Sequence, residues 1–229
     1  EYSISHFKDN FYIITNKDNS KNFKLMRTSL KNTNQKNWKD VIEHRKKILL
    51  EGIEIFNDFL VVIERDSGLV KMNVRKWDNS QNYYLPIEGE TYSLSIGTNI
   101  DFKSTKLRYN FSSLNTPSSV IDFDMETKLF DVKKKQEVVD DNFNEANYIT
   151  ERLWAKSHDG TKIAISLIRH SETKLNDQTP LLLYGYGSYG ITLDPYFSTV
   201  KLSLLNRGFV YAIAPVSYKH LTLPTTYHV

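Results

Sequence analysis

Tyrosine and glycine alternate at one place in this 229-residue sequence, from Tyr184 to Gly190, directly after the apolar run Leu181–Leu183. A short apolar run of this kind favours a buried parallel strand, and the glycines after it let the backbone approach a ligand closely. Such a loop could support acyl transfer, in which hydrogen-bond donors stabilise a developing oxyanion. A tyrosine hydroxyl at the end of a strand can be one of these donors; the alternative is that the tyrosines only pack as aromatic side chains.

Two other residues have a catalytic type of side chain but lack the required pattern. Ser188 lies among glycines, but a hydrolase nucleophile elbow needs glycine two residues before and two residues after the serine, and position 186 is Tyr186. The pattern Gly-x-Ser-x-Gly occurs nowhere in the sequence. His158 precedes Asp159, yet the following Gly160 predicts a hairpin turn in which neighbouring side chains point apart. We therefore expect Ser188 to be a loop residue and His158 to be a turn residue.

The composition argues against metals, cofactors and nucleic acid. The sequence has no cysteine, which excludes disulfides, thiolate metal sites and a cysteine nucleophile and fits a reducing compartment. The six histidines show no metal-ligand spacing, and no glycine-rich phosphate loop occurs. The net charge of +3 comes from interspersed charges, and the basic run Lys133–Lys135 fits a solvated edge or turn.

No membrane segment is predicted either. No apolar run approaches the roughly 18 residues that span a bilayer. The first residues, Glu1–His6, lack the basic and apolar regions of a signal peptide. We expect a cytoplasmic protein, unless a segment before Glu1 directs export.

The elements that must position these residues begin with a β-rich half, from Phe11 to about Glu137. Short apolar runs alternate there with polar turns such as Asp66–Gly68 and Asn115–Pro117, which favours antiparallel sheets. Lys24, Lys71 and Lys128 stand in similar contexts roughly 50 residues apart, the spacing of four-stranded propeller blades. About three blades are expected, and a β-sandwich is the alternative. The expected strands are Tyr12–Ile14, Phe23–Met26, Leu60–Ile63, Leu69–Val74, Leu107–Phe111 and Val120–Phe123.

The second half has a different pattern after the polar stretch 142–150. Alternating runs at 151–156 and 162–169 flank the Asp-Gly hairpin signal. The strand 181–184, an amphipathic segment at 197–206 and a strand at 209–215 then predict a strand–helix–strand unit with a parallel strand pair, the beginning of an α/β sheet. Gly208 should end the helix. A sheet that stops there would leave an unpaired edge near 209–215 and favour aggregation.

Several of these stretches resemble the prolyl oligopeptidase family of serine peptidases, and its oligopeptidase B branch most. They are 38–45, 48–52, 56–62, 181–190, 195–197 and 202–213. The resemblance implies a β-propeller that covers an α/β-hydrolase domain and cleavage of short peptides with a Ser, Asp and His triad. It predicts a partial propeller of antiparallel blades at 1–145, followed by the start of the α/β-hydrolase domain at 146–216.

The resemblance also assigns two site residues. The second tyrosine of the family's Tyr-Gly-Tyr-Gly loop is an oxyanion-hole donor, and it falls on Tyr186. An acidic residue that holds a basic substrate side chain falls on Asp194. The family's second acidic position is occupied by Tyr196, which puts recognition of paired basic residues in doubt. Asp194 could instead start a turn or cap the following helix.

The resemblance ends after Val216, and we expect the tail 217–229 to be foreign to the fold. The triad Ser, Asp and His are absent from the matched region, so we expect a fragment of a serine oligopeptidase that is inactive by itself. The expected partners are short peptides, cut after basic residues, with no nucleic acid and no membrane; the oligomeric state is left open. Cleavage after proline and a noncatalytic propeller module or pseudoenzyme are the alternatives.

Overall fold

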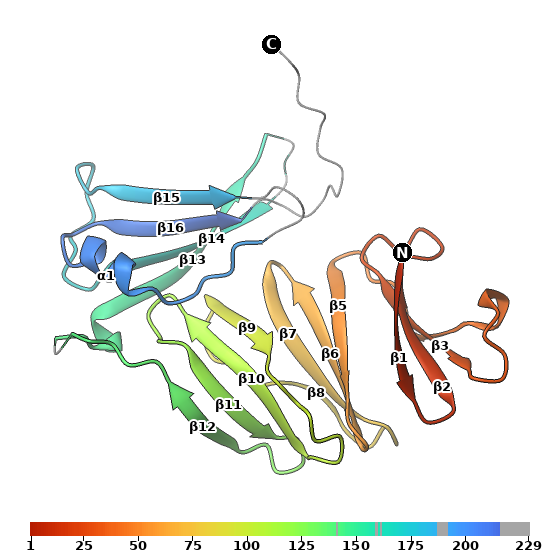
Figure 1. Cartoon of the computed structure of the whole chain (residues 1–229). Coiled ribbons are helices and arrows are strands. Elements are labelled where there is room, and N and C mark those ends of the chain that lie inside the picture. The colour runs from red at the N-terminus through yellow and green to blue at the C-terminus, as the bar shows by residue number, and fades with distance from the viewer. Residues whose placement is uncertain (141, 159, 161, 187–191, 216–229) are drawn as a thin grey trace. The chain divides into compact units, whose positions relative to one another are not determined.

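The computed structural model describes residues 1–140, 142–158, 160, 162–186 and 192–215. These residues form three four-stranded antiparallel sheets, then a four-stranded mixed sheet with one α-helix (Figure 1). The first sheet consists of β1 (Tyr2–Phe7), β2 (Asn10–Thr15), β3 (Lys24–Ser29) and β4 (Lys39–Ile42). The second consists of β5 (Ile48–Ile55), β6 (Phe59–Asp66), β7 (Leu69–Lys76) and β8 (Asn82–Tyr84). The third consists of β9 (Tyr92–Ile96), β10 (Lys106–Ser113), β11 (Ser119–Asp124) and β12 (Phe130–Lys135).

The strands of these sheets follow the sequence pattern. Each of the six expected strands overlaps an observed one, and each sheet is a simple meander in which sequential strands are neighbours. The predicted turn between β6 and β7 has positive φ at Ser67 (54°) and Gly68 (86°), which matches the twist of the two flanking strands. Two short 3₁₀ turns, Gln35–Asn37 and Glu145–Asn147, complete the connections around the three sheets.

The prediction of about three blades is confirmed, but one of the three lysines used to find the repeat is misplaced. Lys24 and Lys71 lie on β3 and β7, the third strands of their sheets. Lys128 lies in the turn between β11 and β12 with φ of 63°. The connection between β9 and β10, at 97–105, is longer than that between β5 and β6, at 56–58, so the interval between equivalent strands is not constant.

The chain divides into two compact units. The first contains Glu1–Ile87, Asn99–Leu107 and Asp124–Leu129; the second contains Glu88–Thr98, Arg108–Phe123 and the described residues from Phe130 onward. In the first unit, an apolar cluster joins the first two sheets, and Trp77 stacks on Phe7 with ring centroids 4.4 Å apart. The second unit holds the third sheet and the mixed sheet, so it carries the residues of chemical interest. The expected domain boundary at residue 145 stays a prediction.

The mixed sheet has the strand order β13-β14-β16-β15. β13 and β14 form the predicted antiparallel hairpin, β14 pairs with β16 in the antiparallel sense, and β15 pairs with β16 in parallel. The predicted strand–helix–strand unit with a parallel pair is therefore confirmed. Gly208, with φ of 85°, follows the helix as expected. The elements are β13 (Tyr148–Lys156), β14 (Lys162–His170), β15 (Leu181–Tyr186), α1 (Thr199–Leu205) and β16 (Val210–Pro215).

The prediction that 181–184 is a buried strand is wrong. β15 is the edge strand of its sheet and has β16 as its one neighbour (Figure 1). Leu181 and Leu183 are 57% and 56% exposed, and every residue of the strand is exposed. The predicted unpaired edge near 209–215 is wrong for the same reason, because β16 lies inside the sheet. An apolar run indicates a strand, but it does not indicate on which side another strand or helix will cover it.

We predict that Leu183→Lys reduces aggregation of the 229-residue chain, because a charge on an exposed apolar edge strand opposes edge-to-edge pairing. The free energy of unfolding should change by less than about 1 kcal/mol, since the side chain is exposed. Static light scattering at increasing protein concentration measures the first effect, and urea unfolding measures the second. Leu175→Lys is the matched control, because it adds the same charge at an exposed loop residue. Equal aggregation of the two variants would contradict the role of the edge.

Candidate active site at the end of the parallel strands

Tyr186 is the last residue of β15, level with Pro215 of β16 in the parallel register. Because alternate residues of a strand share a face, Leu182, Tyr184 and Tyr186 lie on one face of the mixed sheet. The register aligns Leu182 with Tyr211, so this face is also the face of Tyr211. Tyr184 and Tyr186 are 49% and 37% exposed, so solvent can reach both side chains.

Gly185, between these two tyrosines, is not needed for steric reasons. A Cβ atom at Gly185 would lie 3.5 Å from the carbonyl oxygen of Ala214, which is an ordinary contact. The loop that follows, 187–191, lies outside the described residues, and Ser188 lies within it.

Helix α1 packs on the same face of the sheet, over the interior strand β16. Its buried residues, Leu202 and Leu205, pack in one apolar cluster with Phe197 and with Tyr211 and Ile213 of β16. The exposed tyrosines of β15 therefore lie beside a packed region rather than within it. A side chain in that position can meet a ligand while its backbone is held by the sheet.

The segment 192–198, which leads into α1, is attached to the third sheet. The backbone amide of Phe197 donates a hydrogen bond of 2.9 Å to the Ser112 hydroxyl on β10, and both groups are buried. At the other end of the helix, the Tyr148 hydroxyl donates to the Asn206 side-chain oxygen at 2.8 Å. These bonds join residues 85 and 58 positions apart in sequence, so no local pattern could have predicted them.

Asp194 lies in this segment and is partly exposed. Its backbone carbonyl accepts a hydrogen bond of 3.0 Å from the Tyr196 amide, which makes a tight turn there. The N-cap of α1 is Ser198, so the interpretation of Asp194 as the helix cap is wrong. The turn interpretation is confirmed for its backbone, and a role for its carboxylate in substrate binding stays a prediction.

The Tyr211 hydroxyl on this face stays protonated over a wide pH range. Burial raises the pKa of Tyr211 above its ordinary value, and the nearby Tyr196 and Tyr184 raise it further.

Lys201 of α1 lies near the rings of Tyr196 and Tyr211, and the sequence analysis did not identify it as a site residue. Its polar position in an amphipathic segment gave no sign that its ammonium group would be turned toward aromatic rings.

The other residues considered for chemistry do not join this group. His158 is exposed in the connection between β13 and β14. Its neighbour Asp159 lies outside the described residues, as does the tail 217–229. In the described part of the chain, no group of three or more His, Asp or Glu side chains could hold a metal ion. No helix of the described residues is long and apolar enough to cross a membrane.

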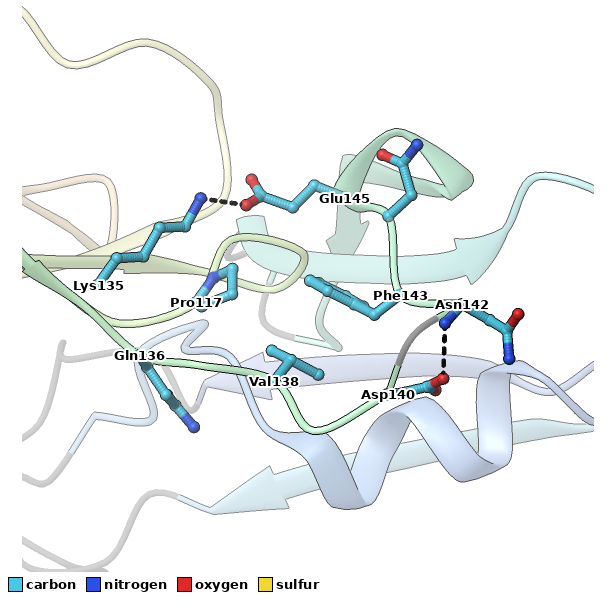
Figure 2. A pocket seen from close by; sticks show the side chains of 9 residues that line it. Pro117, Lys135, Gln136, Val138, Asp140, Asn142, Phe143 and Glu145 are labelled. Atoms are coloured by element: carbon cyan, nitrogen blue, oxygen red, sulfur yellow. Dashed lines mark hydrogen bonds and ion pairs between the residues drawn. The ribbon is translucent and has the colours of Figure 1, made fainter.

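A pocket of 590 Å³ lies elsewhere in the second unit, along the connection between β12 and β13. Figure 2 shows Pro117, Val138 and Phe143 among its lining side chains, with Lys135 paired to Glu145 at its rim. The ion pair already compensates the Glu145 carboxylate. Neither Tyr186 nor Asp194 lines this pocket, so it is separate from the candidate active site.

Comparison with known proteins decides the family. Residues 1–136 match the N-terminal β-propeller domain of prolyl oligopeptidase, which is more than half of the chain. The chain belongs to the prolyl oligopeptidase family. One relative, dipeptidyl aminopeptidase BI of Pseudoxanthomonas mexicana, is 36% identical to this chain over 217 residues. The match covers 94% of this chain and 30% of that protein.

Solved structures of the family have the same arrangement of strands. Oligopeptidase B from Leishmania major matches 93% of this chain and 31% of its own, with a TM-score of 0.84 and 27% identity. Oligopeptidase B from Trypanosoma brucei, in a closed form with covalently bound antipain, matches the same shares, with a TM-score of 0.84 and 29% identity. The chain thus spans about a third of the length of these proteins, and the predicted relationship to oligopeptidase B is confirmed.

We predict that Ser112→Ala loosens the attachment of segment 192–198 to the third sheet. The substitution leaves the buried Phe197 amide without a partner, which should lower the free energy of unfolding by about 1–3 kcal/mol. Urea unfolding measures this change, and faster hydrogen exchange of the Phe197 amide locates it. Ser203→Ala, at an exposed residue of α1, is the control and should change stability by less than about 0.5 kcal/mol. Unchanged exchange at Phe197 would show that the bond does not hold the segment.

Proposed function

We propose that this chain is the propeller-bearing part and the beginning of the peptidase domain of a serine oligopeptidase. The observation that carries the proposal is the place of Tyr186, at the carboxyl end of a parallel strand, in a chain of the prolyl oligopeptidase family. Ligands of α/β sheets bind outside the carboxyl ends of the strands. A hydroxyl there can donate to the oxyanion of a tetrahedral intermediate.

The mixed sheet supports its assignment as the start of an α/β-hydrolase domain. Helix α1 packs on one face, whereas Leu181 and Leu183 of the opposite face are exposed, and so is Leu153 of β13. Register places these three leucines on that one face, since Leu153 aligns with Ile165 and Leu181 with Val210. Sheets with parallel strands are normally covered on both faces. An open apolar face is therefore consistent with a sheet that further residues of a longer protein complete.

In the proposed reaction, a serine supplied by the rest of the complete protein attacks the carbonyl carbon of a peptide bond. A histidine takes the serine proton and passes it to the leaving amine, and an aspartate orients the histidine. Tyr186 donates a hydrogen bond to the oxygen that becomes negatively charged, together with a backbone amide. The propeller restricts entry, so that short peptides are cleaved and folded proteins are not.

The proposed substrates are peptides with a basic residue before the cleaved bond. Two features support this preference: the similarity to oligopeptidase B, and Asp194 on the segment that leads from the Tyr-Gly loop to α1. A single carboxylate fits one basic side chain, because Tyr196 occupies the second position. Cleavage after proline is the alternative within the same family.

The test compares the 229-residue chain with the complete protein that contains it, using fluorogenic peptides that end in arginine or in proline before the reporter group. We expect hydrolysis by the complete protein, faster after arginine, and none by the chain alone, because the sequence contains no Gly-x-Ser-x-Gly elbow. Faster cleavage after proline than after arginine would show that the proposed preference for basic residues is wrong. Peptide binding without cleavage by the complete protein would instead support a noncatalytic module.

We predict that Tyr186→Phe in the complete protein lowers kcat by about 10²–10³-fold, because the lost hydroxyl acts on the transition state. KM should change little, since the ground-state carbonyl needs this donor less. Steady-state kinetics with the arginine peptide measures both constants. Tyr184→Phe is the matched control, because this tyrosine is exposed on the same face of the same strand. An equal effect of the two substitutions would remove the special role of Tyr186.

A further inference from the structure

The ammonium group of Lys201 is enclosed by aromatic rings. Its Nζ atom lies 4.4 Å from the centroid of the Tyr196 ring and 4.8 Å from that of the Tyr211 ring. It also donates a hydrogen bond of 3.0 Å to the backbone carbonyl of Tyr196. Both distances to the rings are within the range in which a cation is attracted by the face of an aromatic ring.

These contacts are the charge compensation that the described residues provide for Lys201. Within the described ranges, no carboxylate forms an ion pair with its Nζ atom. Burial lowers the pKa of Lys201 to about 8. A cation that is half-buried without a counter-ion is costly to retain for stability alone, so its contacts suggest another use.

Lys201 connects three elements of the second unit. It belongs to α1, Tyr211 belongs to β16, and Tyr196 belongs to the segment that leads into α1. Tyr196 in turn donates its amide to the carbonyl of Asp194, two residues earlier. The ring of Tyr196 is 52% exposed, so the surrounding apolar cluster does not fix it. The contact with Lys201 therefore joins the Tyr196 ring of this turn to the helix and to the sheet.

We propose that Lys201 is a positioning residue that holds the turn Asp194–Tyr196 on the face of the mixed sheet, so that the Asp194 carboxylate is presented to a basic side chain of the substrate. The inference deepens the proposed function and rests on it. The ammonium group acts through Tyr196 and does not touch the substrate.

The anchoring depends on pH in one direction. A protonated Lys201 attracts both ring faces, whereas the neutral amine keeps only the hydrogen bond to the carbonyl. Anchoring is thus present below pH 8 and weakens as pH rises through about 8, the pKa of Lys201. The turn itself carries Asp194 and Tyr196. Titratable and charged groups on the same face of the sheet are Tyr184 and Tyr186 on β15, Tyr211 on β16, Lys162 and His170 on β14, and Tyr148, Arg152 and Lys156 on β13.

The first experiment needs no enzymatic activity. Hydrogen exchange of residues 192–198 is measured in the 229-residue chain and in its variants Lys201→Met, Lys201→Arg and Lys174→Met, the last a control at an exposed loop lysine. We expect about tenfold faster exchange in Lys201→Met at pH 7, wild-type exchange in Lys201→Arg, and no change in Lys174→Met. Equal protection in Lys201→Met and wild type would overturn the anchoring. Because Lys201→Arg keeps the charge, it remains informative if Lys201→Met fails to fold.

The second experiment uses the complete peptidase and the arginine peptide. Lys201→Met should raise KM about tenfold with little change in kcat, and Lys201→Arg should restore KM. The wild-type KM should rise between pH 7 and pH 9, and this rise should be absent in Lys201→Met. A fall in kcat with unchanged KM, or the same pH profile in both proteins, would overturn the positioning role. Absence of peptidase activity in the wild type would defeat the proposed function instead, and would leave the exchange result standing.

Discussion

The apolar cluster beneath α1 is the constraint on which the candidate site depends. A helix of seven residues is too short to be stable by itself in water, so its position is set by what it buries. Leu202 and Leu205 are buried against Tyr211 and Ile213 of β16. Because β16 also carries β15 as its parallel neighbour, the same packing fixes the strand that presents Tyr186 relative to the helix.

Hydrogen bonds add direction to this packing. Apolar burial is roughly proportional to area and does not specify orientation, whereas a buried amide needs a partner at a defined distance and angle. Ser112 supplies that partner to Phe197, and Asn206 accepts the hydroxyl of Tyr148. These two bonds hold the chain at residues 197 and 206, and the turn at Asp194–Tyr196 lies directly before the first of them. Lys201 lies between the two bonded residues and contacts Tyr196 of this turn.

The edge position of β15 exposes the side chains on both faces of the strand, and this has two consequences. An edge strand with a covered interior neighbour keeps its backbone in register while its side chains remain accessible, which suits a residue that must meet a ligand. The same exposure places leucines in water on the opposite face, which favours association with other chains. In the proposed complete protein, further residues would cover the leucines while the end of the strand stays open.

The sequence by itself determined six of the twelve strands of the antiparallel sheets, the number of these sheets as about three, the hairpin at β13 and β14, and the parallel pair of β15 and β16. These follow from local periodicity, from turn residues with positive φ such as Gly68 and Gly208, and from the short range over which a helix connects parallel strands. Resemblance to a family assigned Tyr186 and Asp194 to roles, which remain proposals. Tertiary structure alone decided that β15 is an exposed edge, that Lys128 lies in a turn, and that Ser112 and Lys201 hold the segment beside the site. The edge position of β15 and the contacts of Ser112 and Lys201 depend on how the elements pack together, which local sequence patterns do not report. Lys128 was misplaced because the connections between strands differ in length from sheet to sheet.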